Sequence, residues 1–466
     1  MLRLALSALA VAPLLAAPTS FAVGAGAGPA PGHEARSADD NPSSAPGAAK
    51  AGKVYQWKAK DGLAFEYRVP KGYDPEVGAN LTLVLHGNGL DHRWTFWNHP
   101  QDEFRPDDLV VSPDGTTAHS GTGANEFLAG ANDVARVKAL ILELKATWNV
   151  RQVFLYGHSQ GAFFVYLFAG AEPDLVDGVV GHAGGVWNGT DAPKKAQHQA
   201  IGFLHGTNDH IPYGQAVGGR TFYEERKYPL VHLRTLFGWD HRPHWYQAAQ
   251  VLAWCEGMTS ADPARVAAAA EDLADTKRPM GVDWSALRAV AARLQGLEGA
   301  SAAQSARGVQ LVRAVDELAD KYVDSIVKDA GKRGFAEFSP GGWSCELARF
   351  LEVFYGTPAA DALVKKHSKQ LEAVREAGSK ARRAAYAAIE KDSADALDEA
   401  ITLIEDGYLD PAIAETLTAV DKWLEETKAR LPKKSRARYE ELARAWRKAQ
   451  DEGARDFDQR AAKTKL

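Results

Sequence analysis

The sequence predicts a doubly wound, mostly parallel α/β sheet followed by an all-α, bundle-like domain. Two observations favour this fold class. Between residues 53 and 258, short apolar runs that stop at glycine alternate with segments of helical length, which is the order of elements in a parallel sheet covered on both faces. Beyond residue 258 the chain is rich in Ala, Glu, Lys, Arg and Leu, with apolar residues at helical spacing.

The length and charge of the chain exclude several classes of protein. It has 466 residues, which at roughly 100 to 200 residues per domain predicts two or three folding units. Lysine and arginine number 55 and aspartate and glutamate number 60, so the formal net charge is −5. A net-acidic chain lacks the basic excess that binding to nucleic-acid phosphates requires, so we expect no nucleic-acid partner.

Residues 1–22 have the pattern of a secretory signal peptide. Arg3 precedes an apolar stretch that is too short to span a membrane, and the small residues Ser20 and Ala22 suit cleavage after Ala22. We therefore expect a secreted or other extracytoplasmic protein, with an uncleaved anchor as the alternative. Residues 23–52 are rich in Gly, Ala, Pro and Ser and are interpreted as a flexible linker. No later apolar run predicts a membrane span.

The remaining chain divides by composition. Residues 53–258 contain 12 of the 14 histidines, whereas residues 259–466 contain a far denser set of charged side chains. Such a change predicts two domains with different roles. We expect residues 53–258 to form the α/β catalytic domain and residues 259–466 to form a charged helical domain.

The expected strands of the first domain are short apolar runs. They cover residues 81–85, 110–111, 153–156, 178–180, 201–204 and 231–237. The expected helices cover residues 132–146, 162–168 and 247–255. Ligands of open α/β sheets bind at the carboxyl ends of the strands, so the loops that follow the strands are where we expect the chemistry.

A candidate nucleophile, Ser159, lies in the sequence Gly157-His-Ser-Gln-Gly161, after one expected strand and before one expected helix. In a nucleophile elbow the turn is so tight that glycine is needed two residues on either side of the serine. The Gly-x-Ser-x-Gly pattern alone is weak, because it also occurs by chance. The flanking strand and helix make it informative, and the alternative is an elbow that has lost activity.

A serine hydroxyl needs a base to take its proton and a carboxylate to orient that base. Asp209 follows the expected strand at residues 201–204, although Asp also caps turns of this composition. His241 follows the last expected strand and is the candidate base, with His244 as the alternative base. The order Ser159, Asp209, His241 is the serine, acid, histidine order expected of this architecture.

Two backbone N–H groups should stabilise the oxyanion that forms when the serine attacks a carbonyl. The N–H of Gln160 is expected to supply one, because Gln160 begins the helix after the nucleophile. The other is expected from Asn88, which has glycine on both sides in the loop after residues 81–85, with Gly89 as the next choice.

Together these residues resemble the α/β-hydrolase family. The resemblance is to its secreted esterase and depolymerase branches, such as the polyhydroxybutyrate depolymerase and feruloyl esterase-like groups. It covers residues 53–258 and rests on the loop after residues 81–85, the serine elbow, the sequence leading to Asp209 and the late histidine. It implies an acyl-transferring serine but no particular substrate. Many relatives have a single histidine after the last strand, whereas this chain has both His241 and His244.

Aromatic residues border the expected cleft. Trp94 and Trp97 follow the oxyanion loop, and Trp187 follows a glycine pair, so all three are candidate substrate-binding residues. Packing within the loop is the alternative for Trp94 and Trp97. We find no closely spaced set of Cys and His residues, so we predict no metal site and no cofactor.

In residues 259–466 the apolar positions repeat at helical spacing. Examples are Leu311, Val315, Leu318, Tyr322 and Ile326, then Leu397, Ile401 and Ile404, then Leu417, Val420 and Leu424. This pattern predicts antiparallel helices that dock a surface or protein partner, cap the first domain, or serve as a structural appendage. Cys255 and Cys345 would sit in different domains, and whether they form a disulfide stays open.

The function that these patterns favour is that of a secreted serine hydrolase that cleaves carboxylic esters through a covalent acyl-enzyme. Its acyl and alcohol parts are not predicted. A serine peptidase of the same fold, similar to the prolyl oligopeptidase group, is the first alternative. A non-catalytic binding or scaffold protein that acts through its helical domain is the second.

Overall fold

The protein is described by a computed structural model. The structure describes the following residues: 45–100, 103–115, 117–118, 125–128, 131–211, 213–276, 281–333, 350–406, 412–427 and 432–445. The predicted signal peptide, most of the predicted linker and Cys345 lie outside these residues. Within the described part, no helix is both long enough and apolar enough to cross a membrane.

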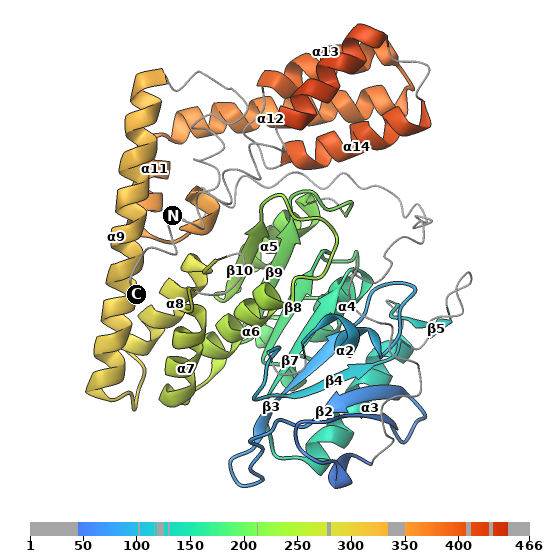
Figure 1. Ribbon diagram of the computed structural model, residues 1–466, viewed down its shortest axis with the longest axis vertical. Helices are drawn as coiled ribbons and strands as arrows, with labels where there is room; N and C mark the ends of the chain where they lie inside the picture. Colours follow the sequence, from blue (N-terminus) through green and yellow to red (C-terminus); the bar gives the residue numbers. More distant parts are fainter. Residues whose placement is uncertain are drawn as a thin grey trace.

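An eight-stranded sheet forms the centre of the molecule (Figure 1). Its strands are β1 Val54–Lys58, β2 Ala64–Arg68, β3 Ala79–Leu85, β4 Leu109–Pro113, β7 Val150–His158, β8 Gly178–His182, β9 Ala200–Gly206 and β10 Val231–Leu236. The order across the sheet is β1-β2-β4-β3-β7-β8-β9-β10. A separate two-stranded pair joins β5 Thr117–Ala118 to β6 Asn125–Glu126.

Six neighbouring strands, from β4 to β10, are parallel, and β1 and β2 add an antiparallel edge. All residues of β3, β4, β8 and β9 are buried, as expected for strands that are covered on both faces. The expected strands from residues 81 to 237 are therefore confirmed. The predicted strands did not include β1 and β2; β2 carries the charged residues Glu66 and Arg68, which the fold buries.

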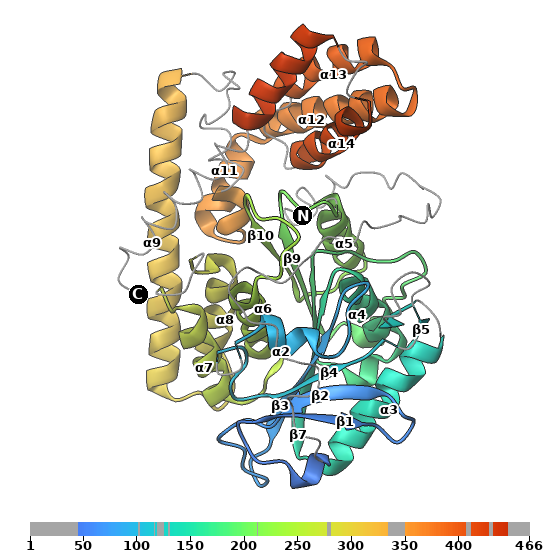
Figure 2. The same ribbon diagram turned by 45° about the vertical axis from the view of Figure 1, so that its right-hand side comes forward.

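Helices cover both faces of the sheet (Figures 1 and 2). One face packs against α3 Ala131–Thr147, α4 Gln160–Ala171 and α5 Gly214–Glu225. The other face packs against the short helix α2 Trp94–Asn98 and against α6 Trp245–Thr259. Three short 3₁₀ helices complete this part: η1 Pro46–Ala48, η2 Pro173–Leu175 and η3 Lys194–Ala196. The doubly wound α/β architecture predicted from the sequence is thus confirmed.

The region after residue 258 is helical, as predicted. Its named helices are α7 Pro263–Leu273, α8 Trp284–Gln295, α9 Ala302–Arg333, α11 Pro358–Lys366, α12 Ser368–Glu390, α13 Ala394–Asp406 and α14 Ala412–Glu426. A further helix covers residues 433–445. The helices therefore occupy most of the described residues from 259 onward.

The buried core does not stop at residue 258. A single apolar cluster runs from the sheet and α6 through α7, α8, α9 and α11, and it includes Trp254, Trp284, Leu311 and Phe354. His232 on β10 also binds Asp283 at the start of α8, with 2.7 Å between Nε2 and Oδ2. The first helices of the charged region are thus packed on the central sheet, and the division at residue 258 stays a prediction about folding units.

The last helices form their own core. Apolar residues of α12, α13, α14 and the helix at residues 433–445 make a cluster that is separate from the sheet. Figures 1 and 2 show α12, α13 and α14 grouped together, away from the strands. The expected apolar positions in this part, from Leu397 to Leu424, are buried. Of the earlier set, Leu311, Val315 and Leu318 are buried, Tyr322 is partly buried, and the side chain of Ile326 lies outside the described residues.

Two further predictions concern the start of the chain and the cysteines. Residues 45–52 belong to the expected linker, yet Pro46 is buried and the N–H of Gly52 binds the carbonyl of Val69 at 2.8 Å. Ordered contacts therefore begin before Val54, where we expected them to start. Cys255 is buried, and its pairing with Cys345 stays untested because Cys345 lies outside the described residues.

Candidate active site

Ser159 occupies the turn between β7 and α4. Its φ of 55° and ψ of −118° are unusual for a residue with a side chain, because the β-carbon then crowds the backbone. The N–H of Ser159 binds the carbonyl of His182 on the neighbouring strand at 2.9 Å, which helps to hold this conformation. A serine held in such a turn at the end of a central parallel strand has the geometry of a nucleophile elbow.

The two glycines of the elbow are required by close backbone contacts. A β-carbon at Gly157 would lie 2.1 Å from the carbonyl oxygen of Gly161. A β-carbon at Gly161 would lie 2.4 Å from the carbonyl oxygen of Leu85, so α4 passes directly against the end of β3. Only glycine permits these approaches, and they bring Ser159 beside the loop that follows β3.

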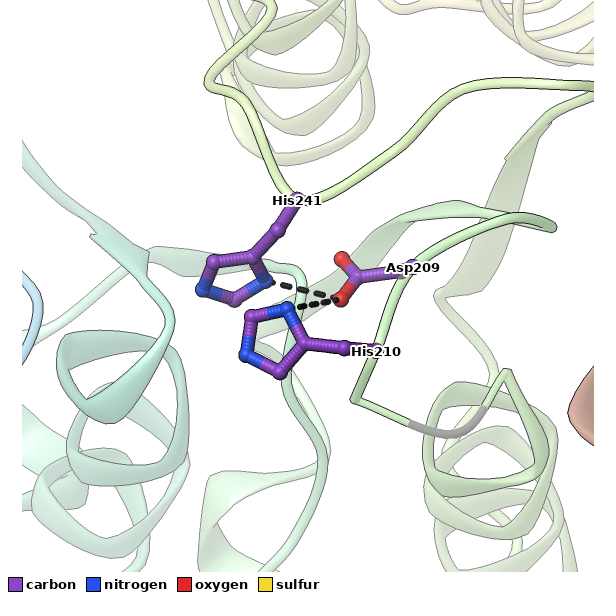
Figure 3. Close-up of side chains that lie close together, drawn as sticks. All are labelled: Asp209, His210 and His241. Carbon is purple, nitrogen blue, oxygen red and sulfur yellow. Dashed lines mark hydrogen bonds and ion pairs between the residues drawn. The ribbon is translucent and has the colours of Figure 1, made fainter. Parts of the chain in front are cut away.

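Asp209 and His241 meet across the loops that follow β9 and β10 (Figure 3). The distance from Asp209 Oδ1 to His241 Nδ1 is 2.8 Å, and the Asp209 side chain has no exposed surface. Burial raises the pKa of Asp209, but the hydrogen bond and the charge of His241 outweigh this effect, so the pKa is lowered overall. A buried carboxylate on Nδ1 fixes the ring with its other nitrogen, Nε2, available as a base.

His244, the alternative base, is engaged elsewhere. It is buried at the start of α6, where its Nδ1 accepts a hydrogen bond from the N–H of Gln247 at 3.4 Å. Burial and the nearby charge of Arg234 lower the pKa of His244 to about 4. No carboxylate is bonded to its ring among the described residues, so the geometry favours His241 as the base.

A second imidazole lies beside this pair. His210 Nδ1 is 3.7 Å from Asp209 Oδ1, and the centroid of the His210 ring is 4.0 Å from that of His241. Figure 3 shows both imidazoles reaching the same carboxylate oxygen. Burial, followed by the proximity of His241, lowers the pKa of His210. The sequence analysis predicted no site role for His210, although His210 directly follows Asp209 in the chain.

The loop after β3 lies against the elbow. A β-carbon on Gly87 would be 3.1 Å from the β-carbon of Ser159, so the loop backbone lies directly against Ser159. Gly89 has a φ of 75°, and the N–H of Leu90 binds the carbonyl of Gly87 at 3.4 Å, which closes a turn around Asn88. Within the described part of the chain, no acceptor takes the Asn88 N–H.

Gln160 begins α4, where backbone N–H groups lack acceptors inside the helix. Its side chain donates from Nε2 to Glu126 Oε2 at 2.9 Å. The two expected oxyanion donors, Gln160 and Asn88, therefore belong to the two segments that meet at Ser159. Their role as donors stays a prediction.

Hydrogen bonds to the segment after β4 hold the loop after β3 in place. Asp114 Oδ1 accepts hydrogen bonds from both the N–H and the Nδ1 of His92, each at 2.8 Å. His86 is fully buried, and its Nε2 accepts the N–H of Gly115 at 3.1 Å. The segment after β4 thus anchors the candidate oxyanion loop at two points.

The three candidate substrate-binding tryptophans have different surroundings. Trp94 is buried and stacks on His158 with ring centroids 5.3 Å apart, so it packs under the site. Trp97 is 44% exposed, with the guanidinium of Arg93 5.3 Å from its ring centroid. Trp187 is half-buried and stacks on Phe163 at 5.7 Å. Of the three, Trp97 presents the largest exposed fraction.

Comparisons with known proteins give likenesses to solved structures. No protein-family model matches the chain, and no curated protein matches its sequence. A thermostable esterase is 17% identical over 43% of this chain and 61% of its own length, with a TM-score of 0.33. A carboxylesterase from Bacillus cereus is 17% identical over 42% of this chain and 94% of its own, with a TM-score of 0.35.

A third likeness is to Est1E from Butyrivibrio proteoclasticus, solved with ferulic acid bound. It is 16% identical over 42% of this chain and 94% of its own, with a TM-score of 0.32. Likenesses of this size bear on neither substrate nor mechanism. The α/β-hydrolase fold rests instead on the strand order, the parallel connections and the strained serine turn described above.

Proposed function

We propose that this chain is a secreted serine hydrolase that cleaves carboxylic esters through a covalent acyl-enzyme. The observation that carries the proposal is the 2.8 Å contact between Asp209 and His241 on the same sheet edge as Ser159, whose turn is strained. A serine after β7, a buried carboxylate after β9 and an imidazole after β10, all at the carboxyl ends of parallel strands, are the parts that acyl transfer needs.

In the proposed reaction, the Ser159 hydroxyl attacks the ester carbonyl while His241 Nε2 takes its proton. Asp209 accepts a hydrogen bond from Nδ1 of His241 and stabilises the imidazolium that forms. The N–H groups of Gln160 and Asn88 bind the oxyanion. His241 then protonates the departing alcohol, and a water molecule that His241 activates releases the acid from Ser159.

The ester class is a further part of the proposal. The resemblance implies no particular substrate, but the feruloyl esterase-like and polyhydroxybutyrate depolymerase groups that it includes suggest which esters to compare first. The exposed Trp97 offers a flat apolar face to an aromatic or extended substrate. A short-chain nitrophenyl ester, a feruloyl ester and polyhydroxybutyrate are therefore the first substrates to compare.

The test is labelling with a fluorophosphonate, which forms a stable adduct only with an activated serine. Mass spectrometry of the wild-type protein should find one adduct, on Ser159, and Ser159→Ala should have neither adduct nor ester turnover. A folded wild-type protein that takes no label and turns over none of the three esters would refute the proposal. Turnover of a peptide instead of an ester would favour the peptidase alternative.

A further inference from the structure

The carboxylate of Asp209 is shared by two imidazoles. Asp209 Oδ1 lies 2.8 Å from His241 Nδ1 and 3.7 Å from His210 Nδ1. Ligand atoms of all three residues lie within 4.8 Å of one another, and they form the one group of three or more candidate ligands found among the described residues. Figure 3 shows the two rings side by side, each with a nitrogen facing the carboxylate.

Two imidazole nitrogens and one carboxylate oxygen make a common ligand set for zinc. At zinc–ligand bonds of about 2.0 to 2.1 Å, the ligands of a tetrahedral site are roughly 3.4 Å apart. The observed separations of 2.8 and 3.7 Å fall on either side of this spacing. Small movements of the two rings would therefore bring the three atoms to bonding distance, with a fourth position left for water.

The surroundings suit a reversible site. The Asp209 side chain is fully buried, and the N–H of Ile211 binds its Oδ1 at 2.7 Å, so the carboxylate is held in place. Its other oxygen, Oδ2, is buried without a hydrogen-bond partner among the described residues. The His210 side chain is 52% exposed and that of His241 is 21% exposed, which leaves a path for an ion from solution.

We propose that Asp209, His210 and His241 form an inhibitory binding site for zinc or a similar divalent transition-metal ion. The ion binds Nδ1 of both imidazoles and the Asp209 carboxylate. The proton that His241 carries on Nδ1 in the triad then resides on Nε2, and no proton is gained or lost overall. With Nε2 protonated, His241 cannot accept the proton of Ser159, so acyl transfer stops until the ion leaves.

The metal-binding part of this inference is independent of the reaction, whereas inhibition rests on the proposed function. Binding is therefore measured first, by titrating the full chain, freed of metal, with zinc chloride in a calorimeter. We expect one zinc ion per chain for the wild type and at least tenfold weaker binding for His210→Ala. His198→Ala removes an exposed histidine outside the site and should bind zinc like the wild type.

The second measurement is ester turnover as a function of zinc concentration, with each variant compared with its own zinc-free rate. Zinc should inhibit the wild type, a chelator should restore its rate, and His210→Ala should need at least tenfold more zinc for half inhibition. Calcium and magnesium, which prefer oxygen ligands, should not inhibit. His210→Asn serves as a second variant if His210→Ala does not fold by circular dichroism.

Several results would overturn the inference. One is a wild type that binds no zinc at 100-fold excess, and another is a His210→Ala variant that binds it as tightly as the wild type. Zinc binding without loss of turnover would refute the inhibitory role. If the wild type hydrolyses no ester at all, the proposed function fails, and the calorimetric comparison still decides the metal site.

Discussion

His158 donates a hydrogen bond from Nε2 to the backbone carbonyl of His241 at 2.8 Å. The residue directly before the candidate nucleophile thus holds the loop that carries the candidate base. Burial, followed by the proximity of His241, lowers the pKa of His158 to about 3, so the ring stays neutral. Because the acceptor is a carbonyl, the neutral ring must carry its proton on Nε2. We therefore assign His158 as a residue that positions His241.

The first prediction concerns this hydrogen bond. His158→Phe keeps a ring that can stack on Trp94 but has no donor, so kcat should fall roughly five- to thirtyfold, as expected for the loss of a buried hydrogen bond of about 1 to 2 kcal/mol. KM should change little, because no substrate contact is removed. His158→Gln places an amide donor near the same point and should recover part of the loss. Equal kcat values for the two variants would argue against the positioning role.

The second prediction separates the two candidate bases. His241→Ala should lower kcat at least 1,000-fold, because the triad loses its base. His244→Ala should keep kcat within about threefold and lower the free energy of unfolding by roughly 0.5 to 1 kcal/mol, since it removes a helix cap. Steady-state kinetics and urea unfolding of both variants check this. The reverse pattern of kcat values would identify His244 as the base.

The third prediction concerns the close approach of α4 to β3. Gly161→Ala places a β-carbon 2.4 Å from the Leu85 carbonyl oxygen and should lower the free energy of unfolding by roughly 3 kcal/mol or more. Gly218→Ala on α5 is the matched control, because a β-carbon there has no atom within 4 Å. It should raise stability by up to about 1 kcal/mol, the gain expected for Gly to Ala in an exposed helix. Urea unfolding of both variants gives the comparison.

The fourth prediction concerns the contact that joins α8 to the sheet. Burial raises the pKa of Asp283, but the charge and hydrogen bond of His232 outweigh it and lower the pKa to about 2. A lowered carboxyl pKa stabilises the fold fully above the unfolded value of 3.8, and this contribution is lost as the pH falls toward 2. The shift corresponds to roughly 2 kcal/mol.

Asp283→Asn tests this contribution. Asparagine also caps helices well, so the variant should lose the ion pair and keep the start of α8. Its free energy of unfolding should lie roughly 2 kcal/mol below that of the wild type at pH 5 to 6, and the difference should shrink as the pH falls from about 4 to 2. Urea unfolding across this range measures it. A difference that stays constant over these pH values would show that the charge of Asp283 contributes nothing.

Much of the fold could be predicted because it depends on local patterns. Short apolar runs predicted six strands of the sheet at nearly their observed positions: β3, β4, β7, β8, β9 and β10. The antiparallel edge was missed, since β2 contains Glu66 and Arg68, whose burial depends on partners far away in the chain. Arg68 donates hydrogen bonds to the carbonyls of Phe104 and Arg105. The local sequence of β2 does not predict these contacts.

Tertiary contacts also decide which of the helices after residue 258 pack on the sheet. Composition changes near residue 258, yet the buried core continues from α6 into α7, α8 and α9. A helix with a charged outer face has the same sequence pattern whether its apolar face packs on a sheet or on other helices. The contact between His232 and Asp283 shows which of these applies to α8.

The sequence by itself determined the serine turn, the order of the candidate nucleophile, acid and base along the chain, and the parallel α/β class. These features depend on glycine spacing and on short apolar runs, which act on the backbone close by. Only the tertiary structure decided which of His241 and His244 faces Asp209, and it alone brought His210 and His158 to the pair. These side chains come from the end of β7 and from the loops after β9 and β10, and their meeting depends on how the sheet aligns the ends of those strands.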